Sequence, residues 1–181
     1  IDIKLKREEV DISTVSAAYR IGDVGYIAIS SFSKVVYNDL IKAYKTLGDV
    51  SSLIIDLRNN GGGSEGGAID LASLFLKKGE VVVYNEYRDR EVCIRVKRGD
   101  SILSDIPLTI LINEVSASAS ELFAGAIQDN DRGVIVGRTS FGKGLTQRII
   151  DLKDGSGITL TIARYKTPSG RIIQRPYTMG D

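Results

Sequence analysis

The sequence contains no histidine and only one cysteine among its 181 residues. Histidine is the base that most often activates a serine nucleophile, so a catalytic serine in this chain would need a different base. A single cysteine excludes an internal disulfide and a zinc site made of thiolates, and it leaves the redox compartment undetermined. We expect Cys93 to be an ordinary residue of the alternating strand-like stretch EVCIRVK.

The chain also lacks a surplus of one charge and a long apolar run. Its 24 basic and 23 acidic residues give a net charge of +1, which creates no strong field for nucleic acid or an anionic membrane. No run of about 18 apolar residues occurs, so no segment of the sequence predicts a membrane-spanning helix. The carboxylates form no clustered motif, and we therefore expect neither a metal site nor a cofactor.

What is present is an alternation of strands and helices in a chain long enough for one domain. Apolar runs and turn residues predict strands at 24–32, 52–58, 107–113 and 133–137, a strand pair within 81–96 and a hairpin within 147–167. Apolar residues at helical spacing follow the first three of these strands. The order predicts an α/β layered domain with a largely parallel sheet and added antiparallel hairpins. In such a sheet, sites form at the carboxyl ends of the strands.

The first candidate loop is DLRNNGGGS, at the end of the 52–58 strand. Consecutive glycines leave backbone N–H groups uncovered and permit backbone angles that other residues avoid. That suits a donor pocket for a developing oxyanion or a bound anion. A flexible turn into the next helix would give the same pattern, so this stretch alone does not separate the two interpretations.

The second loop, NEVSASASELFAGA, places three serines at alternating positions before a helix. Ser118 and Glu121 match a capping box, so a structural role for Ser118 competes with a role as nucleophile. The two roles are compatible, because the amide of Ala119 in the first helical turn is free to donate to an oxyanion formed by attack.

The third loop, GRTSFGKGLTQ, supplies a candidate base. Lys143 stands between two glycines, so the backbone can approach a site closely while the side chain enters a pocket. Because a lysine has an ordinary pKa of about 10.4, it acts as a base near neutral pH only when burial or another cation lowers that pKa. We therefore expect Lys143 to be desolvated and to lack a close carboxylate; a solvated loop lysine is the alternative. Gln147 follows in an extended segment, and we expect it on the same strand face, where its amide would orient the amine.

Gly137-x-x-x-x-Gly142-Lys143 after an apolar strand also approaches the phosphate-binding loop of nucleotide-binding proteins. The pattern fails at two points. Gly144 stands where such loops have the Ser or Thr that holds magnesium, and LTQRIIDL reads as a strand where a helix should cradle the phosphate. A nucleotide binder is therefore a minor alternative.

Together, DLRNNGGG, SASASELFAGAIQD and GRTSFGKGLTQ resemble the catalytic core of the C-terminal processing peptidases, the tail-specific protease family of serine-lysine endopeptidases. Order and spacing agree from about residue 20 to residue 174. The resemblance implies the fold shared with the Clp peptidase (ClpP) and crotonase group. It implies Ser118 as the nucleophile and Lys143 as the base, and Gln147 matches the glutamine that many members have four residues beyond that lysine.

The same resemblance implies the oxyanion donors, which are the amide of Ala119 and that of Gly62 or Gly63. Asp129, at the end of the serine helix, and the pair Asp56 and Arg58 are expected to be structural, for example in ion pairs. Gly61 stands where many members have proline, and we expect it to loosen the glycine-rich loop.

The activity implied is a serine endopeptidase that cuts extended or unfolded protein substrates near their C-termini through an acyl-enzyme. Members usually work in the bacterial cell envelope, the periplasm included, or in the chloroplast lumen. Many carry a PDZ domain that captures substrate C-termini by strand addition. Residues 1–20 resemble the linker or strand segment that follows such a domain, so we expect this segment and a protease core at 21–181. The chain opens with Ile1, and we expect either an excised protease core or a protein that selects its substrates differently.

Two other classes remain open. An inactive relative would keep a groove for extended peptides and lack a competent Ser/Lys pair. A crotonase-type acyl-CoA enzyme would share the fold and the backbone oxyanion donors, but it would not need Lys143.

Overall fold

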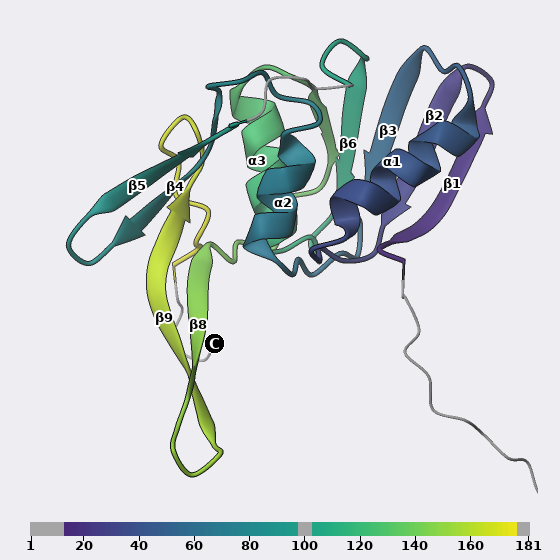
Figure 1. The fold of residues 1–181 in the computed structure, drawn as a ribbon. Coiled ribbons are helices and arrows are strands. Elements are labelled where there is room, and N and C mark those ends of the chain that lie inside the picture. Colours follow the sequence, from purple (N-terminus) through teal and green to yellow (C-terminus); the bar gives the residue numbers. More distant parts are fainter. Residues whose placement is uncertain (1–12, 98–102, 177–181) are drawn as a thin grey trace, which may run out of the picture.

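The computed structural model describes residues 13–97 and 103–176 (Figure 1). In chain order, the described elements are β1 (Val15–Ile21), β2 (Val24–Ile29), α1 (Val36–Leu47), β3 (Ser52–Asp56), α2 (Glu65–Ala72), β4 (Val81–Tyr87), β5 (Glu91–Arg95), β6 (Leu108–Ile112), α3 (Ala119–Asp129), β7 (Val134–Gly137), β8 (Leu145–Asp151) and β9 (Gly157–Lys166). Within these residues, no helix has the length and apolar content needed to cross a membrane.

One layer is a five-stranded sheet in the order β1-β2-β3-β6-β7. Strands β2, β3, β6 and β7 run parallel, and β1 pairs antiparallel with β2. Helix α1 packs on β1 and β2, while α2 and α3 pack against each other and α3 also contacts β7 (Figure 1). The predicted α/β domain with a mostly parallel sheet is therefore confirmed.

The central strand β3 and helix α3 form for the reasons that their sequences suggest. β3 is a short apolar run with Leu53 and Ile55 fully buried, as expected of a strand in the middle of a sheet. The apolar residues that repeat at helical spacing in α3, such as Leu122 and Phe123, all lie in the core.

Helix α2 is shorter than its apolar pattern predicts. The pattern extends to Leu76, but the helix ends at Ala72. The N–H groups of Leu74 and Phe75 donate to carbonyls three residues earlier, so the chain tightens into turns after Ala72. Phe75 and Leu76 are nevertheless fully buried, because the turns keep them against the same core.

A second, antiparallel sheet has the order β5-β4-β9-β8. The two hairpins within it are those predicted from the sequence; one turns near Arg88–Arg90 and the other at Asp154–Gly157. Their association through β4 and β9, which pairs Tyr84 with Lys166, has no local signal in the sequence. Figure 1 shows the β8–β9 hairpin extending away from the helices.

Three loops leave the carboxyl ends of adjacent parallel strands. The glycine loop (57–64) follows β3, the serine loop (113–118) follows β6, and the lysine loop (138–144) follows β7. Because β3, β6 and β7 are neighbours in the sheet, the three loops meet at one edge. The meeting is direct: the Ala117 N–H donates to the Asn60 carbonyl at 3.1 Å, and the Phe141 N–H donates to the Ser116 carbonyl at 3.0 Å.

The expected division of the chain at residue 20 stays a prediction. Strand β1 crosses that position and belongs to the main sheet. Residues 1–12, which make up most of the proposed linker, lie outside the described residues.

Candidate active site

The three serines of the serine loop and the first turn of α3 have different surroundings. Ser116 and Ser120 are fully buried. The Ser116 hydroxyl donates to the Leu57 carbonyl at 2.7 Å, and the Ser120 hydroxyl donates to the Asn60 carbonyl at 2.9 Å. Ser118 is only partly buried. Ser116 and Ser120 therefore pack inside the fold, and Ser118 is the one of the three that a substrate can reach.

Ser118 stands in an unusual backbone conformation at the turn from β6 into α3. Its φ is 56° and its ψ is −113°, in a region that residues other than glycine seldom adopt. Serine nucleophiles of other hydrolases stand on a similarly strained strand-to-helix turn, which pushes the hydroxyl out of the fold. Strain that the surrounding structure maintains is a mark of a functional position.

Two backbone N–H groups near Ser118 are free to donate. Those of Gly63 and Ala119 have no acceptor among the described residues, whereas the Gly62 N–H donates to the Asn60 side chain at 2.9 Å. The sequence left Gly62 and Gly63 as alternatives for the oxyanion donor. In this arrangement the Gly63 N–H is the available one.

Gly62 instead lets the glycine loop approach the nucleophile closely. Its φ is 102°, and a Cβ atom there would lie 2.6 Å from the Ala117 carbonyl oxygen, 2.8 Å from Ser118 Cβ and 2.9 Å from the Ala119 nitrogen. Only glycine fits this position, so Gly62 belongs to the site through its size and its backbone angle.

Asn60 is a site residue that the sequence reasoning missed. Its fully buried side chain donates to the Ile29 carbonyl at 2.8 Å and accepts from the Gly62 N–H. We expected Gly61 to loosen the glycine loop, but the structure shows a loop that Asn60 holds to β2 and to the serine loop. The signal was the asparagine itself, a residue whose short amide often bonds to nearby backbone in turns.

Lys143 is exposed, so the expected desolvation is wrong for this arrangement. The reason is its place in the lysine loop just before β8, which among the described residues is an edge strand paired with β9 alone. Among the described residues, its side chain has no ion pair with a carboxylate.

Gln147 lies exposed on β8. The structure removes the basis for expecting it on the same strand face as Lys143. Lys143 precedes the strand, and the register shifts between Thr146 and Gln147. A bulge of this kind breaks the alternation of side chains on which the expectation depended.

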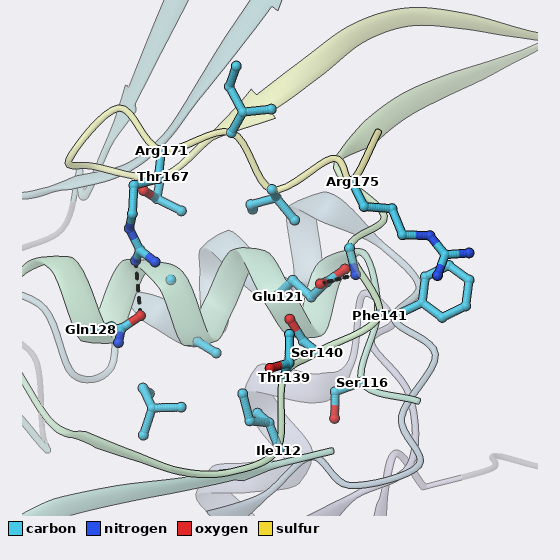
Figure 2. Close-up of a pocket in the computed structure, with 16 residues that line it drawn as sticks. Ile112, Ser116, Glu121, Gln128, Thr139, Ser140, Phe141, Thr167, Arg171 and Arg175 are labelled. Carbon is cyan, nitrogen blue, oxygen red and sulfur yellow. Dashed lines mark hydrogen bonds between the residues drawn. The ribbon is translucent and has the colours of Figure 1, made fainter. Parts of the chain in front are cut away.

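Glu121 connects the serine loop to the lysine loop. Its carboxylate accepts from the Ser118 N–H at 2.9 Å, from the Gly142 N–H at 2.6 Å and from the Lys143 N–H at 2.8 Å. Figure 2 shows this side chain extending from α3 to the backbone of the lysine loop. The capping-box bond from the Ser118 N–H to Glu121 is present, as predicted, but no motif predicted the two bonds to the lysine loop.

A cavity of about 450 Å³ lies beside Glu121. It opens between α3, the lysine loop and the segment 167–175, with Phe141 and Arg175 on its wall (Figure 2). Neither Ser118 nor Lys143 lines the cavity, which therefore flanks the candidate catalytic residues.

Asp56 and Asp129 have the structural surroundings that we expected. Asp56 forms a bidentate ion pair with Arg58 and accepts from the Tyr26 hydroxyl at 2.6 Å. Asp129 pairs with Arg171 and accepts from the Ser169 hydroxyl at 2.6 Å. Burial alone would raise the pKa of each carboxyl group, but these hydrogen bonds outweigh it and lower both pKa values.

Comparison with known proteins gives matches along almost the whole chain. The model of Peptidase family S41 matches residues 23–180. Carboxyl-terminal-processing peptidase 3, chloroplastic, of Arabidopsis thaliana is 38% identical and covers 93% of this chain. Carboxyl-terminal-processing protease of Synechocystis sp. is 39% identical and covers 99% of it. The chain spans only 34% and 43% of the lengths of these two relatives.

Solved structures match in the same way. The photosystem II D1 C-terminal processing protease superposes with a TM-score of 0.78 at 35% identity, over 93% of this chain and 47% of that one. The tricorn protease is more distant, with a TM-score of 0.51 at 21% identity over 82% of this chain and 13% of its own, and that likeness concerns the fold alone.

Proposed function

The chain belongs to peptidase family S41, and from this we propose that it is the catalytic part of a serine endopeptidase with Ser118 as its nucleophile. One observation supports the choice of residue above the others. Among the described residues, Ser118 is the one serine with a left-handed backbone, on a strand-to-helix turn beside the N–H groups of Gly63 and Ala119, which have no acceptor there.

The reaction proceeds through an acyl-enzyme. The Ser118 hydroxyl oxygen attacks the carbonyl carbon of the scissile peptide bond while its proton passes to the neutral amine of Lys143. The N–H groups of Ala119 and Gly63 donate to the oxyanion that forms, helped by the positive end of the α3 dipole. As the C–N bond breaks, the Lys143 ammonium returns the proton to the leaving amine, and water, deprotonated by the same lysine, then hydrolyses the ester.

Lys143 must be neutral to accept that proton, and a lysine in water is protonated at neutral pH. Because Lys143 is exposed, we infer that bound substrate covers it and supplies the missing desolvation. A hydrogen bond from the covered amine to the amide oxygen of Gln147, which would add no negative charge that favours the ammonium form, stays a prediction.

Extended or unfolded proteins, cut near their C-termini, are the proposed substrates. The relatives reported above are named for carboxyl-terminal processing, and we carry that substrate class over to this chain as a proposal. A PDZ domain joined to the core through residues 1–20, and a location in the cell envelope or periplasm, belong to the same proposal. Sequencing the native protein upstream of Ile1 and fractionating its cells would test both.

The other functions considered from the sequence have less support. A nucleotide-binding loop needs a helix after Gly142-Lys143, and the chain enters β8 there. An acyl-CoA enzyme of the crotonase type would not need Lys143, and a peptide-binding relative without turnover would need neither Ser118 nor Lys143.

The decisive test compares the chain with Ser118→Ala and Lys143→Ala variants. New peptide ends released from an unfolded protein of known C-terminal sequence are detected by mass spectrometry. We expect both changes to reduce turnover by a factor on the order of 10⁴ or more, because they remove the nucleophile and its base. Ser16→Ala and Lys153→Ala, which alter exposed residues away from the three loops, should cleave as the parent does.

A fluorophosphonate that labels activated serines gives a readout independent of substrate choice. Label found on Ser118 by peptide mapping supports the proposal. Cleavage or labelling that persists in Ser118→Ala would show that another residue is the nucleophile, and full activity in Lys143→Ala would reject the proposed base.

A further inference from the structure

Glu121 is the one described side chain that bonds to backbone groups beside both Ser118 and Lys143. Its Oε2 accepts from the Ser118 N–H at 2.9 Å and from the Lys143 N–H at 2.8 Å, while its Oε1 accepts from the Gly142 N–H at 2.6 Å. The nucleophile and the base of the proposed function are thus attached to the same carboxylate through their backbones.

Helix capping explains only part of this arrangement. A capping box requires the bond from Glu121 to the Ser118 N–H, within one turn of α3. The other two donors stand 21 and 22 residues further along the chain, in the lysine loop. A glutamate that served the helix alone would have no need of them.

The burial of Glu121 supports a role beyond capping. The side chain is 5% exposed, and a buried carboxylate is costly unless its charge is compensated. No ion pair with another described residue compensates it. Three N–H donors and the positive end of α3 do so instead, which fixes the carboxylate firmly in place.

The lysine loop is held from two sides, and Glu121 supplies most of one of them. On the far side, Gly142 and Gly144 bond to the segment 174–175. On the side of α3, the Glu121 carboxylate accepts two bonds and the Ser116 carbonyl accepts one from the Phe141 N–H. At the start of the loop, Arg138 donates to the Ile112 carbonyl and to Glu114. The Lys143 side chain is exposed, so its backbone is what locates it relative to Ser118.

We propose that Glu121 is a positioning residue that sets the separation of Ser118 and Lys143 by binding the backbone N–H groups beside both. It touches neither the substrate nor the reacting atoms. This inference rests on the proposed function, since it assigns Glu121 a part in the same site.

The test uses Glu121→Gln, Glu121→Asp and the control Glu114→Gln. A glutamine amide offers a single acceptor oxygen, so at least one of the three N–H donors faces its NH₂ group. An aspartate keeps the charge and remains a helix-capping residue, but it is shorter by one methylene and cannot also span to the lysine loop. Glu114 is an exposed glutamate in the serine loop whose side chain pairs with that of Arg138 in the lysine loop, and its change removes an equal charge without touching a backbone N–H of that loop.

We expect both Glu121 variants to lower kcat on the order of 100-fold, the effect of displacing a catalytic group by about 1 Å, while KM changes little. Glu114→Gln should retain the parent kcat.

Hydrogen exchange followed by NMR gives a second measurement, which a role in helix capping alone would leave unchanged. The amide protons of Gly142 and Lys143 should exchange roughly 10-fold faster or more in both variants, while those in the centre of α3 keep their protection.

Parent values of kcat in Glu121→Asp, or faster exchange confined to the first turn of α3, would overturn the proposal and leave Glu121 as a helix cap. If Glu121→Gln fails to fold, Glu121→Asp alone decides between the two roles. Fluorophosphonate labelling of Ser118 in the unmodified chain separates this inference from the proposed function. Absence of labelling and cleavage would reject the protease, whereas the exchange rates at Gly142 and Lys143 still report whether Glu121 holds the loop.

Discussion

At the scale of single residues, Gly61 and Gly62 differ sharply in the room they offer to a side chain. A Cβ on Gly62 would enter contacts below 3 Å with backbone atoms of Ala117 and Ala119, at a φ of 102°. A Cβ on Gly61 would meet nothing within 4 Å, and its φ lies outside the left-handed region. Two adjacent glycines thus provide a matched pair of variants.

We expect Gly62→Ala to displace the glycine loop from Ser118, with a loss of activity on the order of 100-fold and a loss of about 1–3 kcal/mol in the free energy of unfolding. Gly61→Ala should keep activity and gain about 0.4–1 kcal/mol, because it restricts the unfolded chain. Rates of fluorophosphonate labelling and thermal melting measure both effects. A normal labelling rate in Gly62→Ala would contradict the role given to this close approach.

The role of a residue could be predicted from the sequence where its neighbours in the chain determine that role. It could not be predicted where distant parts of the fold determine it. The choice of Ser118 among three serines followed from motif position, and the burial of Ser116 and Ser120 agrees with it. The choice between Gly62 and Gly63 depends on a side-chain bond from Asn60 that no motif specifies. The exposure of Lys143 depends on which elements cover the start of β8, and the sequence of a loop does not reveal those elements.

At the scale of elements, the carboxyl end of α3 is fastened to the turn after β9. Asp129, near the last turn of the helix, accepts from the Ser169 N–H at 3.0 Å and pairs with Arg171. These contacts fix the segment 167–171, which forms a wall of the cavity beside Glu121. The ion pair expected for Asp129 therefore orders a loop.

We expect Asp129→Asn to lower the free energy of unfolding by about 1–3 kcal/mol, since charged hydrogen bonds at a nearly buried carboxylate become weaker neutral ones. Asp49→Asn, a change of the same kind at an exposed position, should stay within about 0.5 kcal/mol of the parent. Urea denaturation measures both. Equal stabilities of the two variants would mean that the pairing with Arg171 adds nothing.

Elements with a strong local pattern were predictable, and long-range pairings were not. The parallel strands and α3 were predicted because burial on both faces, or on one helical face, leaves a periodic signal. The apolar pattern of α2 continues to Leu76, beyond the end of the helix at Ala72, because the turns that follow also face the core. The joining of the hairpins through β4 and β9 required a register between Tyr84 and Lys166 that only the folded chain reveals.

At the scale of the whole molecule, acid should weaken the fold through Asp56 and Asp129. Both have a folded-state pKa below the ordinary value of 3.8. The folded state therefore binds fewer protons than the unfolded state, and the stability these groups contribute is complete above the ordinary pKa. It is lost as the pH falls through the lowered pKa values of the folded state.

We expect the thermal midpoint to decrease steadily from about pH 4 downwards. The double variant Asp56→Asn/Asp129→Asn should be less stable at neutral pH but should lose less on acidification. Melting curves recorded between neutral and acid pH measure the difference. Parallel curves for the parent and the double variant would assign acid sensitivity to other carboxylates.

The overall architecture was the most predictable property, because the alternation of strands and helices constrains a chain of this length to few arrangements. The geometry between loops was the least predictable. All three candidate loops were expected at one edge of the sheet, and they are found there. How the side chains of Asn60 and Glu121 link them depends on packing that a single sequence does not encode in any local pattern.

The left-handed backbone of Ser118 implies a trade-off between the stability of the fold and its activity. A serine at a φ of 56° stands in a conformation that glycine adopts with little strain, and the rest of the fold must maintain a strain of about 1–3 kcal/mol there. Selection for persistence alone would favour glycine at this position and would remove the nucleophile in the same step. If Ser118 is the nucleophile, selection has retained a serine at position 118 for catalysis at a cost in the stability of the fold.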